Sequence, residues 1–274
     1  MKKILCALLA LTMLFAVCAC GKKPAEVQPT EAPSADASWD YVKANGKIVV
    51  GLDDTFAPMG FRTEAGELVG FDIDLANAVG EVLGVAVEFK PIVWDAKEME
   101  LEGKKIDLIW NGMSKTPERE EGMNLSKPYF NNSIVIMTLK DSELKNKEDL
   151  AGKNIGVQVD SAALEVVKAD AIYGDIVDGL AEYESYDEAV MDLDTGRLDA
   201  VIIDKVAGKY KATVKADTYA FAEEDFGEDY YVIGMRKGDN ALTEKVDAAM
   251  QEVIANGKAA EISKEWFGED LVLR

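Results

Sequence analysis

The 274-residue sequence contains no histidine, and its three cysteines, Cys6, Cys18 and Cys20, all lie at the N-terminus. The absence of histidine excludes the most common general base and the most common metal ligand. Because no thiol follows Cys20, the rest of the chain has no cysteine nucleophile, no CxxC redox pair, no Cys/His zinc site and no internal disulfide. These absences favour a protein with no catalytic residues, no metal site and no cofactor.

Positive charge is also scarce. The sequence has 30 basic and 51 acidic side chains, which gives a net charge of −21. Proteins bind a phosphate backbone by replacing its counterions with Lys and Arg, so this balance argues against a nucleic-acid partner. It argues equally against a polybasic patch on a membrane surface. Hydrophobic residues make up 48% of the chain, which is enough to build ordinary cores.

The N-terminus has the pattern of an export signal. Residues 1–3 are positively charged, and residues 4–17 form an apolar run that is shorter than the roughly 20 residues of a membrane span. Residues 17–21 (VCACG) resemble a bacterial lipobox. This resemblance implies a signal peptide over residues 1–19 and a lipid on the thiol of Cys20. An ordinary secretory signal with incidental cysteines is the alternative.

The segment after the signal is rich in Pro, Ala, Glu, Ser and Thr and has no apolar periodicity. Such a composition cannot bury enough surface to offset chain entropy, so we expect residues 20–39 to be a flexible tether. A lipid, a tether and a folded body indicate an extracytoplasmic protein held at the outer face of the cytoplasmic membrane. The lack of disulfides favours an anaerobic or a Gram-positive cell, of which we expect the Gram-positive type.

The body of the sequence contains two pairs of similar segments. Residues 46–53 (GKIVVGLD) match residues 152–160 (GKNIGVQVD), and residues 101–110 (LEGKKIDLIW) match residues 193–202 (LDTGRLDAVI). Each pair places a short β-branched run after a Gly and a basic residue. The pairs favour two similar α/β lobes, although any two βα units resemble one another to some extent.

Helical patterns lie between these strands, which favours parallel sheets. Helices are predicted over residues 73–83, 162–171, 186–193 and 242–253, with a last short helix that carries Trp266 and Phe267. Ser161 stands where it can cap the second of them.

Ligands of parallel sheets bind beyond the carboxyl ends of the strands. Arg119 follows one such strand end, and arginine binds a carboxylate with two parallel hydrogen bonds. The helix that begins at Ser161 offers free N–H groups to the same carboxylate. Asp204 follows another strand and suits an ammonium group, and Phe56 suits an aromatic wall. Together they complement an α-amino acid, although each alone is also typical of a surface ion pair, a loop acid or a core position.

Four motifs then resemble a known family, the family 3 extracellular solute-binding proteins of amino-acid ABC transporters. They occur in order over roughly residues 45–269, and they are FAP (56–58) with GFDIDLA (70–76), DLIWNGMSKTPER (107–119), GRLDA (196–200) with Asp204, and NGK to WFG (256–268). The resemblance implies a periplasmic-binding-protein-like type II fold, with two α/β lobes joined by a two-strand hinge near residues 131–133 and 228–232. It places lobe 1 at residues 40–131 plus 232–274 and lobe 2 at residues 132–231.

The resemblance also implies roles for individual residues. Arg119 would bind the ligand carboxylate with the backbone N–H groups of Ser114 and Ala162, and Asp204 would bind the ammonium group with the Gly112 carbonyl and the Ser114 hydroxyl. Phe56 and Trp94 would line the side-chain pocket. The full set of predicted ligand-binding residues is Asp53, Phe56, Trp94, Asn111, Gly112, Ser114, Arg119, Ser161, Ala162 and Asp204.

Two departures from the family pattern concern the pocket. Asp160-Ser161-Ala162 replaces a more usual Gly-Ser-Thr or Gly-Ser-Ser, so a hydroxyl is missing and an acid is added. Met59 replaces the usual aromatic residue after Pro58, which is expected to widen the side-chain end.

The identity of the amino acid stays open at this point. Asp53, Asp54 and Asp160 together favour a basic side chain, whereas a neutral polar ligand such as glutamine or cystine is equally compatible. The family implies ABC permease and ATPase subunits as partners, and we expect a monomer. A same-fold enzyme of the dehydratase type, and a ligand-sensing or surface protein without a transport role, are the alternatives.

Overall fold

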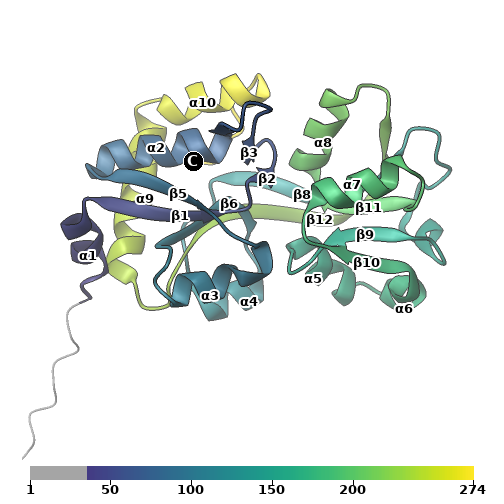
Figure 1. Ribbon diagram of the computed structural model, residues 1–274, viewed down its shortest axis with the longest axis horizontal. Coiled ribbons are helices and arrows are strands. Elements are labelled where there is room, and N and C mark those ends of the chain that lie inside the picture. Colours follow the sequence, from purple (N-terminus) through teal and green to yellow (C-terminus); the bar gives the residue numbers. More distant parts are fainter. Residues whose placement is uncertain (1–35) are drawn as a thin grey trace, which may run out of the picture. The chain divides into compact units, whose positions relative to one another are not determined.

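Strands and helices alternate along the chain in the computed structural model, which describes residues 36–274 (Figure 1). The helices are α1 (Ser38–Asn45), α2 (Phe71–Leu83), α3 (Lys97–Glu102), α4 (Pro117–Gly122), α5 (Ala162–Ala169), α6 (Tyr173–Ile176), α7 (Tyr186–Asp194), α8 (Lys205–Val214), α9 (Asn240–Ala255) and α10 (Lys258–Phe267). The strands are β1 (Lys47–Leu52), β2 (Thr55–Phe56), β3 (Gly60–Arg62), β4 (Leu68–Val69), β5 (Ala86–Pro91), β6 (Leu108–Ser114), β7 (Asn124–Leu125), β8 (Phe130–Leu139), β9 (Ile155–Gln158), β10 (Leu180–Tyr183), β11 (Ala200–Asp204) and β12 (Tyr219–Met235).

The five helices predicted from the sequence are confirmed as α2, α5, α7, α9 and α10. The Ser161 hydroxyl caps α5 by accepting from the backbone N–H of Leu164 at 3.2 Å, as predicted. The predicted signal peptide, the lipidation site Cys20 and most of the predicted tether lie outside the described residues. The end of that tether is helical, because α1 begins at Ser38 and Trp39 packs against the main core.

Within residues 36–274, nine strands form one mixed sheet in the order β10-β9-β11-β8-β12-β6-β1-β5, with β7 beside β12. The outer strands are parallel, as the alternation of strands and helices predicts: β1 pairs with β5 and β6, and β9 pairs with β10 and β11. The expectation is wrong for the middle of the sheet. There β8 runs antiparallel to β11 and to β12, and β12 runs antiparallel to β6, because the chain crosses once in each direction.

Two α/β lobes flank these crossing strands (Figure 1). One lobe contains β1, β5 and β6 with helices α1–α4, α9 and α10, and the other contains β9–β11 with helices α5–α8. The two segments predicted to cross between the lobes lie side by side, since Ser133 pairs with Glu228 and Asn131 pairs with Tyr230. The predicted residue boundaries of the lobes stay a prediction.

Alternating side chains build separate cores on the two faces of the sheet. Val201 and Ile203 of β11 join a large core that continues through both lobes, whereas Ala200 and Ile202 face a second core under α5 and α6. A third core under α3 covers the same second face in the other lobe. Because both faces are covered, β6 and β11 are buried along their whole length, which explains their continuous apolar runs. Residues 36–274 include no helix that is both long and apolar enough to traverse a bilayer.

Candidate functional site

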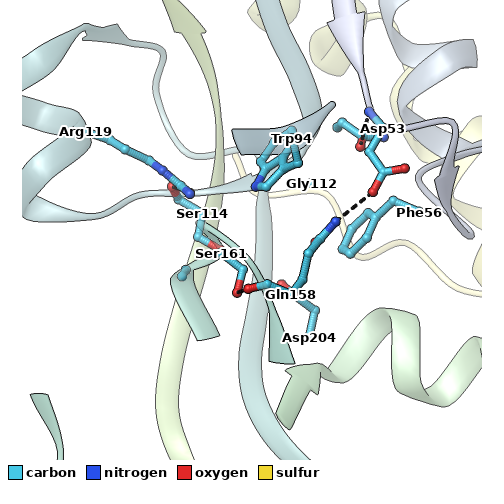
Figure 2. Close-up of a pocket in the computed structure, with 11 residues that line it drawn as sticks. Asp53, Phe56, Trp94, Gly112, Ser114, Arg119, Gln158, Ser161 and Asp204 are labelled. Carbon is cyan, nitrogen blue, oxygen red and sulfur yellow. Dashed lines mark hydrogen bonds between the residues drawn. The ribbon is translucent and has the colours of Figure 1, made fainter. Parts of the chain in front are cut away.

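A small pocket lies where the strand ends of the two lobes meet (Figure 2). It contains about 280 Å³ of space not filled by protein atoms, part of which is open to solvent. The structure brings all ten predicted residues together around this pocket and adds Gln158 to them. The lining consists of Asp53, Phe56, Trp94, Asn111, Gly112, Ser114, Arg119, Gln158, Ser161, Ala162 and Asp204.

The topology of the sheet explains why residues far apart in sequence meet here. Asp53 directly follows β1, Ser114 ends β6, Gln158 ends β9 and Asp204 ends β11. The pocket therefore lies beyond the carboxyl ends of strands from both lobes, where α/β proteins usually bind ligands. Ser161 and Ala162 are contributed by the N-terminus of α5, which immediately follows β9.

Arg119, on α4, lies at one end of the pocket, and only 4% of its surface is exposed. One guanidinium nitrogen (Nη1) donates to the Ser114 carbonyl at 2.8 Å, and the other (Nη2) donates to the Asp160 carbonyl at 3.2 Å. The Trp94 ring lies against the cation, with 6.0 Å between the guanidinium carbon and the ring centre. Neutral carbonyl oxygens thus orient Arg119 without neutralising its charge, and this end of the pocket suits an anion.

Asp204 provides the opposite charge in the same pocket and is 5% exposed. Its Oδ1 accepts from the Tyr231 hydroxyl at 2.8 Å and from the Asn132 amide nitrogen at 2.7 Å. The same amide donates to Asp229 at 2.9 Å, and the Ser114 hydroxyl also donates to Asp229 at 2.6 Å. Burial, and next the charge of Asp229, raise the pKa of Asp204 to about 7. This acidic pair suits a cation.

The third side of the pocket is partly aromatic and partly polar. Phe56 and Trp94 are both buried in its wall. Asp53 accepts from the Gln158 amide at 2.9 Å, as Figure 2 shows, and from the Thr55 backbone N–H at 2.9 Å. Burial is the main cause that raises the pKa of the Asp53 carboxyl. The arrangement suits a ligand side chain that combines apolar surface with a polar group.

The aromatic wall lies close to the backbone at Gly112. It adopts a left-handed φ of 56°, and a side-chain carbon there would lie 2.7 Å from the Phe56 ring. Its N–H donates at 2.6 Å to Asp72, which is buried beneath the pocket and also accepts from the Tyr129 hydroxyl at 2.9 Å. Burial raises the pKa of Asp72 to about 7. Glycine at this position and the buried acid therefore fix one wall of the pocket.

Two of the three acids that favoured a basic ligand have basic partners. Asp54 forms an ion pair with Arg62 at 2.5 Å, and Asp160 forms one with Lys97. The local negative charge around a ligand side chain is consequently lower than the sequence suggests.

Met59 is completely buried in the main core and does not line the pocket, so the expected widening of the side-chain end is wrong.

Gln158 is the pocket residue that the sequence did not predict. It is buried, and its amide donates both to Asp53 and, at 3.0 Å, to the Glu184 carbonyl. The sequence did contain a signal for it, because Gln158 is a polar residue at the carboxyl end of the apolar strand β9. Ligands bind beyond such strand ends, and this rule identified Asp204 at the end of β11.

Comparisons with known proteins agree with this geometry. The sequence model of the bacterial extracellular solute-binding proteins, family 3, matches residues 48–269. The L-cystine-binding protein of Escherichia coli (strain K12) is 30% identical over 232 residues, which cover 84% of this chain and 86% of that protein. The L-arginine-binding protein of Pseudomonas aeruginosa is 31% identical over 236 residues, which cover 83% of this chain and 90% of that protein.

A solved structure of an amino-acid-binding protein is also similar to this chain. The substrate-binding protein of an ABC uptake transporter from Streptococcus pneumoniae, with histidine bound, matches with a TM-score of 0.84 and 36% identity, over 88% of this chain and 100% of that one. These relatives are binding proteins and not enzymes. Since the family match extends over most of the sequence, this chain belongs to the family 3 bacterial extracellular solute-binding proteins.

Proposed function

We propose that this protein captures one L-α-amino acid between its two lobes and delivers it to an ABC importer. The observation that carries the proposal is that a buried cation and a buried acid, Arg119 and Asp204, line the same small pocket. The relatives that bind cystine, arginine or histidine support the ligand class.

The charges of these two residues supply the reason for closure on a ligand. Among residues 36–274, neither Arg119 nor Asp204 has an ion-pair partner. A buried charge without a counter-charge costs several kcal/mol. A zwitterionic amino acid provides the missing charge at both ends, so it stabilises the closed arrangement more than the open one. The ligand then shifts the population toward closure by its difference in affinity for the two forms.

The hinge in this proposal lies in the two crossing strands, β8 and β12. We place lobe 1 at residues 40–131 plus 232–274 and lobe 2 at residues 132–231. Arg119 then belongs to lobe 1 and Asp204 to lobe 2, so one ligand connects both lobes.

The ligand side chain contacts Asp53, Gln158 and the Phe56 and Trp94 rings in this proposal. Because Asp54 and Asp160 are already paired with bases, a single carboxylate, Asp53, remains to select it. A basic side chain would pair with Asp53, and a neutral polar one would hydrogen-bond to the Asp53 carboxylate and the Gln158 amide.

The cellular context belongs to the same proposal. A lipid on Cys20 and the tether that follows would hold the protein at the outer face of the cytoplasmic membrane, in a cell of the Gram-positive type. The folded body would act as a monomer and dock on the permease subunits of the importer, which an ATPase subunit drives. We propose no catalytic step, so the ligand leaves the pocket chemically unchanged.

A ligand screen by thermal unfolding tests this function. Protein that starts at Gly21 is unfolded and refolded to remove any bound amino acid, and its Tm is measured with each of the twenty amino acids, cystine and ornithine. A ligand at 100 times its Kd is expected to add about 2.7 kcal/mol of stability, which raises Tm by several degrees. We expect one amino acid, or a few related ones, to give this shift.

Two controls define the outcomes of the screen. Asp53→Asn should remove the shift from basic amino acids while largely keeping that from neutral ones, which identifies the ligand class. Mass spectrometry of the recovered ligand should show an unaltered amino acid. A refolded sample that responds to no member of the panel would reject the amino-acid proposal, and an altered product would favour the same-fold enzyme.

A further inference from the structure

An ion pair connects the two lobes outside the pocket. Lys97 lies on α3, and only 1% of its side chain is exposed. Its ammonium group contacts the carboxylate of Asp160, which lies between β9 and α5 on the opposite lobe, and also donates to the Asp160 carbonyl at 3.3 Å. Neither residue lines the pocket.

Asp160 is held in an unusual backbone conformation at this contact. Its φ is 53°, a left-handed value that residues other than glycine seldom adopt. Its carbonyl accepts from both Lys97 and Arg119, so two cations of one lobe converge on one residue of the other. The next residue, Ser161, caps α5 and lines the pocket. The position of Asp160 therefore connects the ion pair to the binding site.

We infer that the Lys97–Asp160 pair is an interlobe latch that stabilises the closed form and slows ligand release without contacting the ligand. The inference rests on the proposed closure around an amino acid. It assigns two affinity-determining residues outside the pocket, in one of the positions where this chain departs from its family's usual sequence.

The burial of the two partners determines how the latch acts. Lys97 is buried, so its charge needs a counter-charge in the closed arrangement. Asp160 keeps 46% of its side chain exposed, and Glu98, on the same helix as Lys97, lies 3.4 Å from the ammonium group. Solvent and Glu98 both weaken the pair, so we expect an effect between that of a surface pair and that of a fully buried one. Opening separates the two lobes, so the pair with Asp160 is lost while that with Glu98 is kept.

The inference predicts a change in the dissociation rate. Lys97→Met and Asp160→Asn should each increase koff for the amino acid about tenfold and leave kon within about twofold, because the pair forms after encounter. The double variant should resemble the single variants, since both remove the same contact. Stopped-flow fluorescence measures both rates on protein that starts at Gly21.

Two matched variants separate the latch from general effects on stability. Asp160→Gly removes the carboxylate but adopts the left-handed conformation without strain, so its koff should increase while its Tm stays equal or rises. Lys211→Met removes another largely buried lysine, but one whose partner, Asp187, lies in the same lobe, so its koff should not change. Increases in koff that are additive in the Lys97/Asp160 double variant, or absent from both single variants, would overturn the inference.

A ligand-free measurement distinguishes failure of the latch from failure of the amino-acid proposal. No cysteine follows Cys20, so Glu81→Cys and Asp178→Cys, both at exposed positions, place one spin label on each lobe. Both labels are placed in an Asp204→Asn background, which removes one of the two unpaired charges that oppose closure without a ligand. Pulsed electron–electron double resonance should show that Lys97→Met shifts the interlobe distances of this ligand-free protein toward the open form. A closed population that is the same with and without Lys97→Met would contradict the latch, whether or not an amino acid is the ligand.

Discussion

Replacing Arg119 with alanine is expected to weaken amino-acid binding at least about thirtyfold, or about 2 kcal/mol. Among residues 36–274, Arg119 is the only basic residue in the lining of the pocket, and its contacts with the Ser114 and Asp160 carbonyls hold it in place without neutralising it. Its removal leaves the ligand carboxylate buried without a counter-charge. Arg119→Lys should lose less, because lysine keeps the charge but cannot form two parallel hydrogen bonds. Isothermal titration calorimetry measures both changes.

A surface arginine provides the control for this prediction. Arg197 pairs with Asp192, and 66% of its side chain is exposed, so Arg197→Ala should change the affinity by less than twofold. Each variant must keep the parent's unfolding temperature within a few degrees for the comparison to hold. An Arg119→Ala protein that binds as tightly as its parent would remove Arg119 from the binding site.

The affinity is also expected to decrease as the pH is lowered below about 7. Burial raises the pKa of Asp204 to about 7, with the negative charge of Asp229 as the next cause. The ligand ammonium binds the ionised carboxylate. Below the raised pKa the carboxyl must first release its proton, so the affinity should fall about tenfold per pH unit, whereas above the pKa it should level off. Titration calorimetry between pH 5 and 8, in buffers of different ionisation enthalpy, measures the affinity and the proton released.

Two substitutions identify the group responsible for this pH dependence. Asp204→Asn should abolish it and, like Asp204→Ala, should lower the affinity at pH 8 at least about thirtyfold. Asp229→Asn removes the neighbouring charge and keeps a hydrogen-bonding side chain, so it should move the midpoint to lower pH. A constant affinity from pH 5 to pH 8 in the parent protein would show that Asp204 stays ionised over this range and would contradict its raised pKa.

The sequence predicted the parts of the site that depend on local patterns. Buried strands have continuous apolar runs, and the polar residue that ends such a run lies at the edge where ligands bind, which located Asp53, Ser114 and Asp204. The start of α5 was equally predictable, because the hydroxyl of Ser161 caps the helix by contacting the N–H of Leu164, only three residues further along the chain. The family resemblance then placed Arg119 and Trp94 in the same pocket.

The contacts that the sequence did not predict join segments that only the folded chain brings together. Gln158 meets Asp53 across 105 residues, and Lys97 meets Asp160 across 63. From the sequence, Asp160 was expected to be an unpaired acid near the pocket, because no residue close to it in sequence indicates the contact with Lys97. The antiparallel direction of β8 and β12 was missed for the same reason, because it depends on how the chain crosses between lobes and not on either strand's own pattern.

The central claim is that Arg119 and Asp204 hold the two charged ends of one amino acid. The most direct test is titration calorimetry of the amino acid identified by the screen, together with its methyl ester and its N-acetyl derivative. The ester removes the charge that Arg119 contacts, and acetylation removes the charge that Asp204 contacts. We predict that each derivative binds at least about thirtyfold more weakly than the parent amino acid. Derivatives that bind as tightly as the free amino acid would contradict the account.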